Sequence, residues 1–220
     1  MIAGSGLRTI LGAVLTAALC TACATESRVP DVTHDGLERV SDSAMARAWK
    51  KPGADFSQYT HVGLLDCEVA FKRNWRMNHS GVRTRDMERI KKSLSDEFRK
   101  VFSDELEKGG YPIVTEVDHN VLLIRPAIID LDVTAPDTNS AGRSDSFTTS
   151  AGSMTLVVEF YDSASSEILA RAVDRRNARN VGSVTWTTRG TNTDAARRLL
   201  KRWADLLVKK LDEVHGKKSD

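Results

Sequence analysis

Apolar residues recur at helical spacing in two long segments of the chain. In residues 84–108 they form one stripe at steps of three to five residues, and the other faces carry Lys, Arg, Asp and Glu. The stripe consists of Met87, Ile90, Leu94, Phe98, Val101 and Leu106. Gly109-Gly110 follows, and glycine is preferred just past a helix end. The pattern predicts a long helix whose apolar face packs on a sheet, in preference to a groove for a partner.

A second stripe occupies the C-terminal part of the chain. Thr193 is the expected N-cap, and Asp194 lies in the first turn. The predicted buried face consists of Ala195, Leu199, Trp203, Leu206, Leu207, Leu211 and Val214. Arginines and lysines make the outer face basic. Such a face is typical of a solvated helix, and contact with anionic lipid is the alternative.

Alternation of apolar and polar residues marks the strands. Residues 60–71 are predicted as the first strand. Its core face is expected to be Leu65, Cys67, Val69 and Phe71. Residues 111–114 are predicted as a short strand and residues 121–133 as a longer one that contains Pro126. A proline cannot donate to the ladder, so Pro126 predicts an edge, a bulge or a break.

The clearest β-hairpin joins residues 154–161 to residues 167–175 through a turn at 162–166. Residues 137–152, rich in Ser, Thr, Gly and Asp, are predicted as a flexible connection. Residues 181–186 are a candidate for a brief edge strand. The element order predicts an α/β (α+β) fold: a single antiparallel or mixed sheet of four to six strands with two long helices packed on one face. The opposite sheet face must then be polar or covered by loops.

The N-terminus carries a different pattern. Residues 10–19 are an uninterrupted run of apolar and small residues, preceded by Arg8. The run is shorter than the roughly 20 residues that span a bilayer, and it is typical of a secretory signal. It ends at Leu19-Cys20-Thr21-Ala22-Cys23, which resembles the bacterial lipobox. We therefore predict that Cys23 is the lipidated first residue of the mature chain.

This assignment divides the chain and predicts where it resides. The predicted parts are a lipoprotein signal peptide (1–22), a lipidated N-terminus and tether (23–58), and a single α/β domain (59–220). Two lipid signals already give stable anchoring, so acyl chains on Cys23 would hold the protein on a membrane. Ala24 replaces the aspartate that retains many lipoproteins at the inner membrane. The predicted location is therefore the periplasmic face of the outer membrane.

The two leader cysteines have two other interpretations. Ala22-Cys23-Ala24 is an A-x-A pattern whose cleavage would release a soluble exported protein. Cys20-Thr21-Ala22-Cys23 is also a C-x-x-C, although redox motifs of this type normally lie beside a βαβ pattern rather than at the end of a signal core.

Charge and the remaining cysteine narrow the function classes. The chain has 32 Lys and Arg against 30 Asp and Glu, a net charge of +2, which becomes +1 once Arg8 leaves with the leader. This balance gives no support to a nucleic-acid partner. Cys67 is predicted to be a buried, inert thiol. His61 lies six residues away on the same predicted strand, about 20 Å distant, and is too far to activate it.

Several stretches resemble a known family. They are residues 51–59 with the strand that follows them, the hairpin around Glu159-Phe160-Tyr161-Asp162, and Trp203-Ala204 in the last helix. Together they resemble an uncharacterised bacterial lipoprotein family, domain of unknown function family 3313. The turn departs from it, because Ser165-Ser166-Glu167 stands where the family often has a glycine before the acid. The resemblance implies an exported lipoprotein with one α/β domain and carries over no catalytic residue.

Candidate chemistry is sparse. Asp130 and Asp132 alternate with apolar residues and share a predicted strand face, where they could ligate a metal or act as an acid/base pair. Simple alternation favours a solvated face instead. The five histidines show no metal-ligand spacing, and no phosphate-binding, dinucleotide or nucleophile-elbow motif is present. We therefore predict no catalytic residue, no metal site and no cofactor.

The leading hypothesis is a non-enzymatic, outer-membrane-anchored periplasmic lipoprotein that acts as a binding or envelope-assembly module. Its expected partners are the membrane, through lipid on Cys23, and an envelope protein or glycan. One alternative is an envelope hydrolase that uses Asp130, Asp132 and Glu159, which requires a pocket with two converging carboxylates. The other is a small-ligand carrier, which predicts an apolar cavity between the sheet and the helices.

Overall fold

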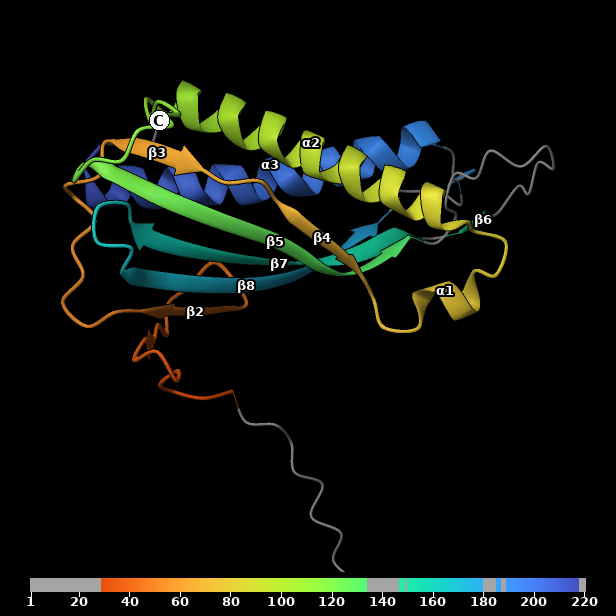
Figure 1. Ribbon diagram of the computed structural model, residues 1–220, viewed down its shortest axis with the longest axis horizontal. Coiled ribbons are helices and arrows are strands. Elements are labelled where there is room, and N and C mark those ends of the chain that lie inside the picture. The colour runs from red at the N-terminus through yellow and green to blue at the C-terminus, as the bar shows by residue number, and fades with distance from the viewer. Residues whose placement is uncertain (1–28, 134–146, 149, 180–184, 187–188, 218–220) are drawn as a thin grey trace, which may run out of the picture.

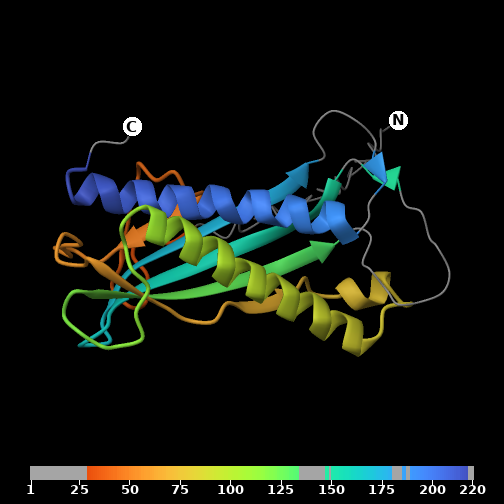
Figure 2. The same cartoon turned by 90° about the horizontal axis from the view of Figure 1, so that it is seen from above.

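A mixed sheet forms one layer of the molecule, and two long helices form the other (Figures 1 and 2). The computed structural model describes residues 29–133, 147–148, 150–179, 185–186 and 189–217. The strands are β1 (Glu38–Arg39), β2 (Arg47–Lys50), β3 (His61–Leu64), β4 (Glu68–Phe71), β5 (Val121–Val133), β6 (Phe147–Thr148), β7 (Ser150–Asp162), β8 (Ile168–Arg179) and β9 (Thr185–Trp186). The helices are α1 (Trp75–Asn78), α2 (Thr84–Lys108) and α3 (Arg189–Val214). The predicted fold class is confirmed.

The main sheet has seven strands in the order β1-β2-β8-β7-β5-β3, and β4 also pairs with β5. β3 and β4 run parallel to β5, one after the other along the same edge, and the other pairings are antiparallel. β6 and β9 form a separate two-stranded sheet. The main sheet exceeds the predicted four to six strands because β1 and β2 extend it beyond β8. Both come from residues 23–58, the predicted lipidated N-terminus and tether, and the described part of this segment packs on the domain.

The single strand predicted for residues 60–71 is wrong, because the chain breaks between β3 and β4. Val62 and Leu64 are buried, whereas Leu65 is 42% exposed. The break reverses the side-chain alternation, so the predicted core face holds only from Cys67 onward. Its cause lies on β5. The Leu65 N–H donates to the Ile124 carbonyl, so the backbone groups of the even-numbered residues of β5 point toward β3 and β4. Pro126 is the next even-numbered residue, and it has no N–H to donate to the strand at this edge.

The two long helices lie on the same face of the sheet and contact each other (Figure 2). α2 has the predicted bounds, and it buries Phe102 in addition to most of the predicted stripe. Phe98 and Phe102 stack with ring centroids 3.9 Å apart. α3 begins at Arg189, so the prediction of Thr193 as N-cap is wrong. Within the part of the chain that the structure describes, neither helix is long and apolar enough to cross a bilayer.

The predictions for the shorter elements have mixed outcomes. The predicted hairpin is confirmed as β7 and β8, although β8 extends to Arg179. The predicted strand at 111–114 is reduced to one bridge between Ile113 and Val62. Most of the flexible connection predicted for 137–152 lies outside the described residues, and its last part belongs to β7. Of the predicted strand at 181–186, the two described residues form β9.

The turn between β7 and β8 shows why the family often has a glycine before the acid. Ser166 has φ 58°, in the left-handed region that glycine adopts without strain. We expect Ser166→Gly to raise the free energy of unfolding by about 0.5 kcal/mol, because relief of the strain exceeds the added entropy of the unfolded chain. Urea unfolding measures the difference. Ser165→Gly is the matched control and should give no gain, since its hydroxyl accepts a hydrogen bond from the Glu167 N–H. A lower urea midpoint for Ser166→Gly would contradict the explanation.

Candidate binding site

The structure does not bring the three candidate carboxylates together. Glu159 lies opposite Arg125 in the β5–β7 register, whereas Asp132 lies opposite Ser153, seven residues farther along β5. At about 3.3 Å per residue this places Glu159 roughly 20 Å from Asp132. Asp130 has φ 51° and sits in a register shift, so simple alternation does not apply to it. No convergent carboxylate pocket of the predicted kind forms from these residues.

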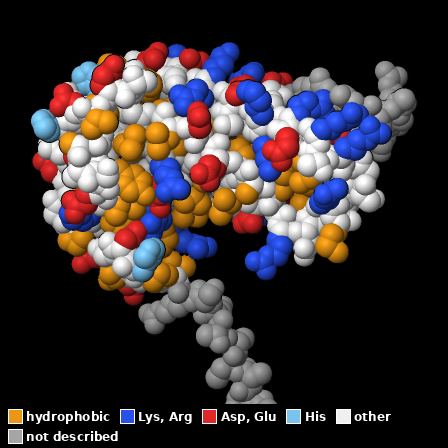
Figure 3. Space-filling model, in the orientation of Figure 1, with side chains coloured by type: hydrophobic (Ala, Val, Ile, Leu, Met, Phe, Trp, Pro, Cys, Tyr) orange, Lys and Arg blue, Asp and Glu red, His pale blue; other side chains and the backbone are white. Residues whose placement is uncertain are grey.

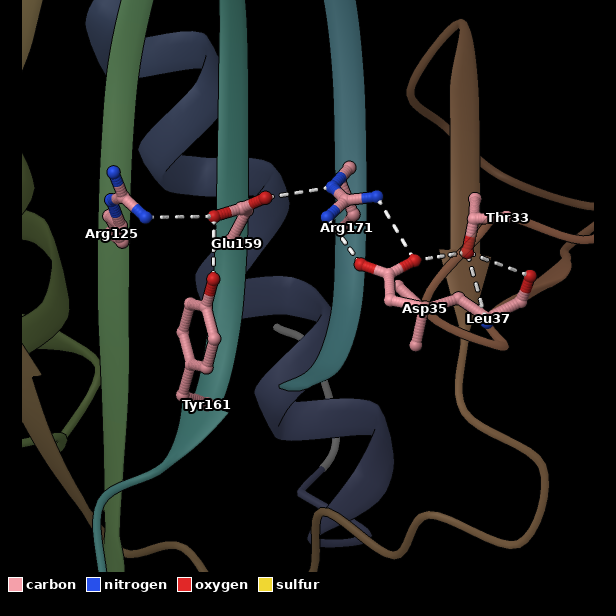
Figure 4. A network of polar contacts seen from close by, with 7 residues as sticks. All are labelled: Thr33, Asp35, Leu37, Arg125, Glu159, Tyr161 and Arg171. Carbon is pink, nitrogen blue, oxygen red and sulfur yellow. Dashed lines mark hydrogen bonds and ion pairs between the residues drawn. The ribbon is translucent and has the colours of Figure 1, made fainter. Parts of the chain in front are cut away.

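Glu159 belongs instead to a polar network on the sheet face opposite the helices (Figure 4). Arg171 Nε donates to Glu159 Oε1 at 2.8 Å, and Tyr161 Oη donates to Glu159 Oε2 at 2.7 Å. Arg125 Nη1 lies 3.7 Å from Glu159 Oε2. The Arg171 guanidinium also binds Asp35, with Nη2 2.6 Å from Asp35 Oδ2. The network therefore joins three strands to the segment that precedes β1.

Asp35 holds this N-terminal segment against the sheet. Thr33 Oγ1 donates to the Asp35 carboxylate and accepts from the Leu37 N–H at 3.0 Å, and Leu37 is fully buried. Burial tends to raise the pKa of Asp35. Hydrogen bonds from Thr33 and Arg171 outweigh this effect and lower the pKa below its ordinary value of 3.8. The polar groups of the network are thus engaged in holding the chain in place.

We expect Asp35→Asn to loosen residues 31–39 without unfolding the domain. Loss of the charged contact to Arg171 is expected to cost about 1 kcal/mol locally and to speed amide exchange there roughly fivefold. Hydrogen exchange with mass spectrometry measures this. Asp55→Asn is the control: the hydrogen bonds of this carboxylate go to Ser57, outside residues 31–39, so the substitution should leave these amides unchanged.

The same segment should respond to acid. Because the pKa of Asp35 is lowered in the folded state, its contribution to stability is present above about pH 3.8 and is lost as the pH falls through the lowered value. Wild-type exchange in residues 31–39 should therefore approach that of Asp35→Asn only in that acidic range. Equal protection in both proteins at neutral pH would contradict the role of Asp35.

Apolar side chains lie between the charged ones on this open face. Figure 3 shows them gathered over the sheet strands in the view of Figure 1. Ile129 of β5 is 38% exposed, and Leu65 at the β3–β4 break is 42% exposed. The sequence-based expectation that this face is polar or covered by loops is met in part, since residues 31–39 cover only the β8 side of it.

Cys67 is buried, as predicted, at 5% exposure. Burial raises the pKa of its thiol to about 12. A thiol with so little thiolate at neutral pH is a poor nucleophile. Among the described residues no three His, Cys, Asp or Glu side chains are grouped to hold a metal ion. Cys23, the predicted lipidation site, lies outside the described residues.

On the helix-covered side, an apolar cavity of about 300 Å³ lies between α3, the sheet and residues 40–45. Its sheet side carries Ala48 of β2 with Ala170 and Ala172 of β8. Ala48 is opposite Ala172, and Ala172 is opposite Val158 of β7, so these positions share one face of the sheet. At the same level β7 contributes Val158 and Phe160. The cavity exists because the outer strands present methyl groups where the inner strand presents larger side chains.

The predicted buried face of the last helix borders this cavity. Trp203 and Leu211 are buried, as predicted. Leu206 and Leu207 are only half-buried although both line the cavity. Val214, which lines its outer end, is 44% exposed. The helix therefore presents more apolar surface to the sheet than the sheet covers.

Asp174 fixes the inner end of the cavity and was not singled out from the sequence. It is 3% exposed and lies opposite Leu156 on the helix-facing side of β8. Trp203 Nε1 donates to its Oδ2 at 2.8 Å, and Arg176 Nε donates to the same oxygen at 2.5 Å. The Ala46 N–H donates to Oδ1 at 3.1 Å. One carboxylate thus holds α3 and the chain entering β2 on either side of the cavity.

The cavity interior is apolar, and its charges lie at the mouth. The Trp203 N–H is already bound to Asp174. Across the described residues, the one buried side-chain polar atom without a hydrogen-bond partner is His215 Nε2, and His215 does not line the cavity. Lys50, Lys210 and Glu213 border the cavity, with Lys210 Nζ 2.6 Å from Glu213 Oε2. The arrangement can enclose an apolar group.

Comparisons with known proteins show the family but no activity. No curated protein sequence matches the chain. The PelC dodecamer of Paraburkholderia phytofirmans is 10% identical, with a TM-score of 0.36 over 70% of this chain and 96% of that one. A candidate homologue of a neuraminyllactose-binding hemagglutinin from Helicobacter pylori is 15% identical, with a TM-score of 0.36 over 74% and 94%. A lipoprotein candidate from Caulobacter crescentus CB15 is 14% identical, with a TM-score of 0.33 over 75% and 98%.

Likenesses at this level carry no argument about function. The family model described as "Protein of unknown function (DUF3313)" matches residues 27–207, which cover the sheet and most of α3. This match includes all the stretches on which the resemblance rests. The chain belongs to the DUF3313 family of proteins of unknown function.

Proposed function

We propose that this chain is a non-enzymatic binding protein of the cell envelope and that the apolar cavity is its binding site. The cavity carries the proposal. Its volume of about 300 Å³ is at the lower end of the range of small-molecule sites, and its apolar interior with a few polar groups at the mouth is the usual composition of such sites. The proposal favours the small-ligand carrier among the functions that the sequence left open.

The hydrolase alternative has less support. Glu159 is held by two arginines and a tyrosine, and it is roughly 20 Å along the sheet from Asp132.

A second candidate function, assembly with an envelope protein or glycan, is favoured by the half-exposed apolar side chains on the open sheet face, such as Ile129. The cavity and the open face lie on opposite sides of the sheet, so the two functions can be tested separately.

In-cell photo-crosslinking distinguishes them. A photoreactive amino acid replaces Leu207, which lines the cavity, or Ile129, which lies on the open face. If the cavity binds a small molecule, the photoreactive residue at position 207 becomes covalently attached to it, and the protein gains a small mass. Washing with an organic solvent removes lipid that is not attached, so the remaining added mass is the adduct. The proposal fails if position 207 yields no such adduct while position 129 yields a protein adduct, which would support assembly instead.

We also propose that lipid on Cys23 anchors the protein at the periplasmic face of the outer membrane, as the lipobox-like stretch before it suggests. Mass spectrometry of the mature N-terminus should find an acylated cysteine at position 23, and the membrane fraction should contain the protein. Cys23→Ser should lose both. An unmodified N-terminus at Thr25 in the native protein would show cleavage after Ala24 and refute the anchor.

A further inference from the structure

One lysine is placed to recognise what enters the cavity. Lys50 ends β2, where it lies opposite Ala170, and Ala170 lies opposite Phe160. Both of these partners line the cavity, so the register directs the Lys50 side chain to the cavity face, one strand in from the edge strand β1. Its ammonium lies 5.5 Å from the ring centroid of Phe56, which also lines the cavity.

This lysine differs from its neighbours in its charge partners. Lys51 pairs with Glu167, and Lys210 across the mouth pairs with Glu213. In the described ranges of the chain, no carboxylate lies within ion-pair distance of Lys50, although Glu38 is opposite it in the β1–β2 register and Asp55 attracts it from farther away. Asp42 is the other acid that borders the cavity, and it is exposed to solvent. Among the described residues, Lys50 is therefore a cation at the mouth that no carboxylate binds directly.

The interior of the cavity determines what kind of group the ligand can bury there. Because the side chains that line the interior are apolar, a polar atom buried there would lose its hydrogen bonds to water without replacement. The volume of about 300 Å³ equals roughly ten water-sized groups, which suits one alkyl chain of about ten carbons and is too small for a two-chain phospholipid. The enclosed part of the ligand is thus a single apolar chain.

Building on the proposed function, we infer that the cavity takes the alkyl chain of a single-chain anionic amphiphile whose carboxylate or phosphate head pairs with Lys50. The chain lies between the alanines of β2 and β8 and the leucines of α3. The head remains at the mouth, where water still reaches it, so its contact with Lys50 adds discrimination more than affinity.

Photoreactive probes with one chain and three heads test this inference. The full lipidated chain is placed in nanodiscs of zwitterionic lipid and exposed to diazirine-bearing C12 carboxylate, alcohol or amine, and the labelled peptides are mapped by mass spectrometry. We expect the carboxylate to label peptides from β8 and α3 about two- to fivefold more than the alcohol, the range of an exposed ion pair, and the amine to label them least.

Two sets of variants test the binding of the alkyl tail and of the charged head separately. Ala170→Leu fills the cavity and should reduce labelling by all three probes at least tenfold, with Ala48→Leu as a second filling variant in case the first folds poorly. Ala127→Leu on the open face is the matched control and should change nothing. Lys50→Gln should abolish the preference for carboxylate over alcohol, whereas Lys100→Gln, on α2 away from the cavity, should preserve it.

The outcomes distinguish the two proposals. If the alcohol labels cavity peptides but the carboxylate labels them no better, or if Lys50→Gln leaves the preference intact, the anionic ligand is refuted and the cavity remains a binding site. If none of the probes labels cavity peptides, or if the filling variants label as well as wild type, both proposals fall together.

Discussion

Replacing Asp174 with alanine is expected to lower the free energy of unfolding by about 3–5 kcal/mol, the cost of breaking a buried charged contact from one side. The side chain is 3% exposed and holds three donors, from Trp203, Arg176 and the Ala46 backbone. Without the carboxylate, the Trp203 N–H would stay buried and unpaired, at a cost of about 1–3 kcal/mol, whereas the exposed Ala46 could bind water instead. Urea unfolding followed by circular dichroism measures the loss.

Two variants calibrate this result. Asp174→Asn keeps an acceptor for Trp203 and should recover part of the stability. Asp205→Ala removes a carboxylate of α3 that pairs with Lys201 at the surface, and it should cost less than about 0.5 kcal/mol. A loss below about 1.5 kcal/mol for Asp174→Ala would mean that the carboxylate does not fix α3 to the sheet.

The second large effect is a contrast between two leucines of one helix. Leu200 of α3 is fully buried, and Leu200→Ala should cost about 2–5 kcal/mol, as for other buried leucines. Leu206 lines the apolar cavity and is half-buried. Because a side chain beside empty space has lost contacts on that side, Leu206→Ala should cost only about 1 kcal/mol or less.

The comparison is internally matched, because both variants make the same change in the interior of the same helix and have equal intrinsic helix propensities. Thermal and urea unfolding should both rank them in this order. Equal losses would mean that the space beside Leu206 is filled in solution, and the cavity would then lose its status as a preformed site.

The sequence predicts best where one local pattern decides the structure. The bounds of α2 follow from its apolar stripe and the glycines after it, and the bounds of β5 follow from its run of mainly apolar residues. The β7–β8 hairpin follows from two alternating runs joined by a short turn. In each case periodicity and the end signals lie within the segment itself, so no distant residue is needed to place them.

Sequence-based predictions fail where the structure of a segment depends on a residue that is far away in the chain. The break between β3 and β4 is set by Pro126, more than fifty residues away, and no feature of residues 60–71 alone reveals it. β2 forms because Ala48 and its neighbours pair with β8, across more than a hundred residues. A short segment of mixed polarity gives no strand signal of its own until its partner strand is known.

The candidate site illustrates the same limit. Ala48, Ala170 and Ala172 are unremarkable in sequence, and only the β2–β8 register places them on one face. The sequence does contain a signal for Asp174, because this residue continues the parity of Ala170 and Ala172 on the hairpin strand and is the first charged residue in that row, ahead of Arg176. A charged residue on the apolar parity of a strand indicates a buried partner, which here is Trp203.

Native mass spectrometry of the full chain released from envelopes tests the central claim most directly, namely that the cavity between α3 and the sheet holds an apolar small molecule. Wild type, Ala170→Leu and Ala127→Leu are compared after identical extraction. The account predicts about one equivalent of a non-covalent ligand on wild type and on Ala127→Leu, and none on Ala170→Leu. Bare masses for all three proteins, or the same ligand on all three, would contradict it.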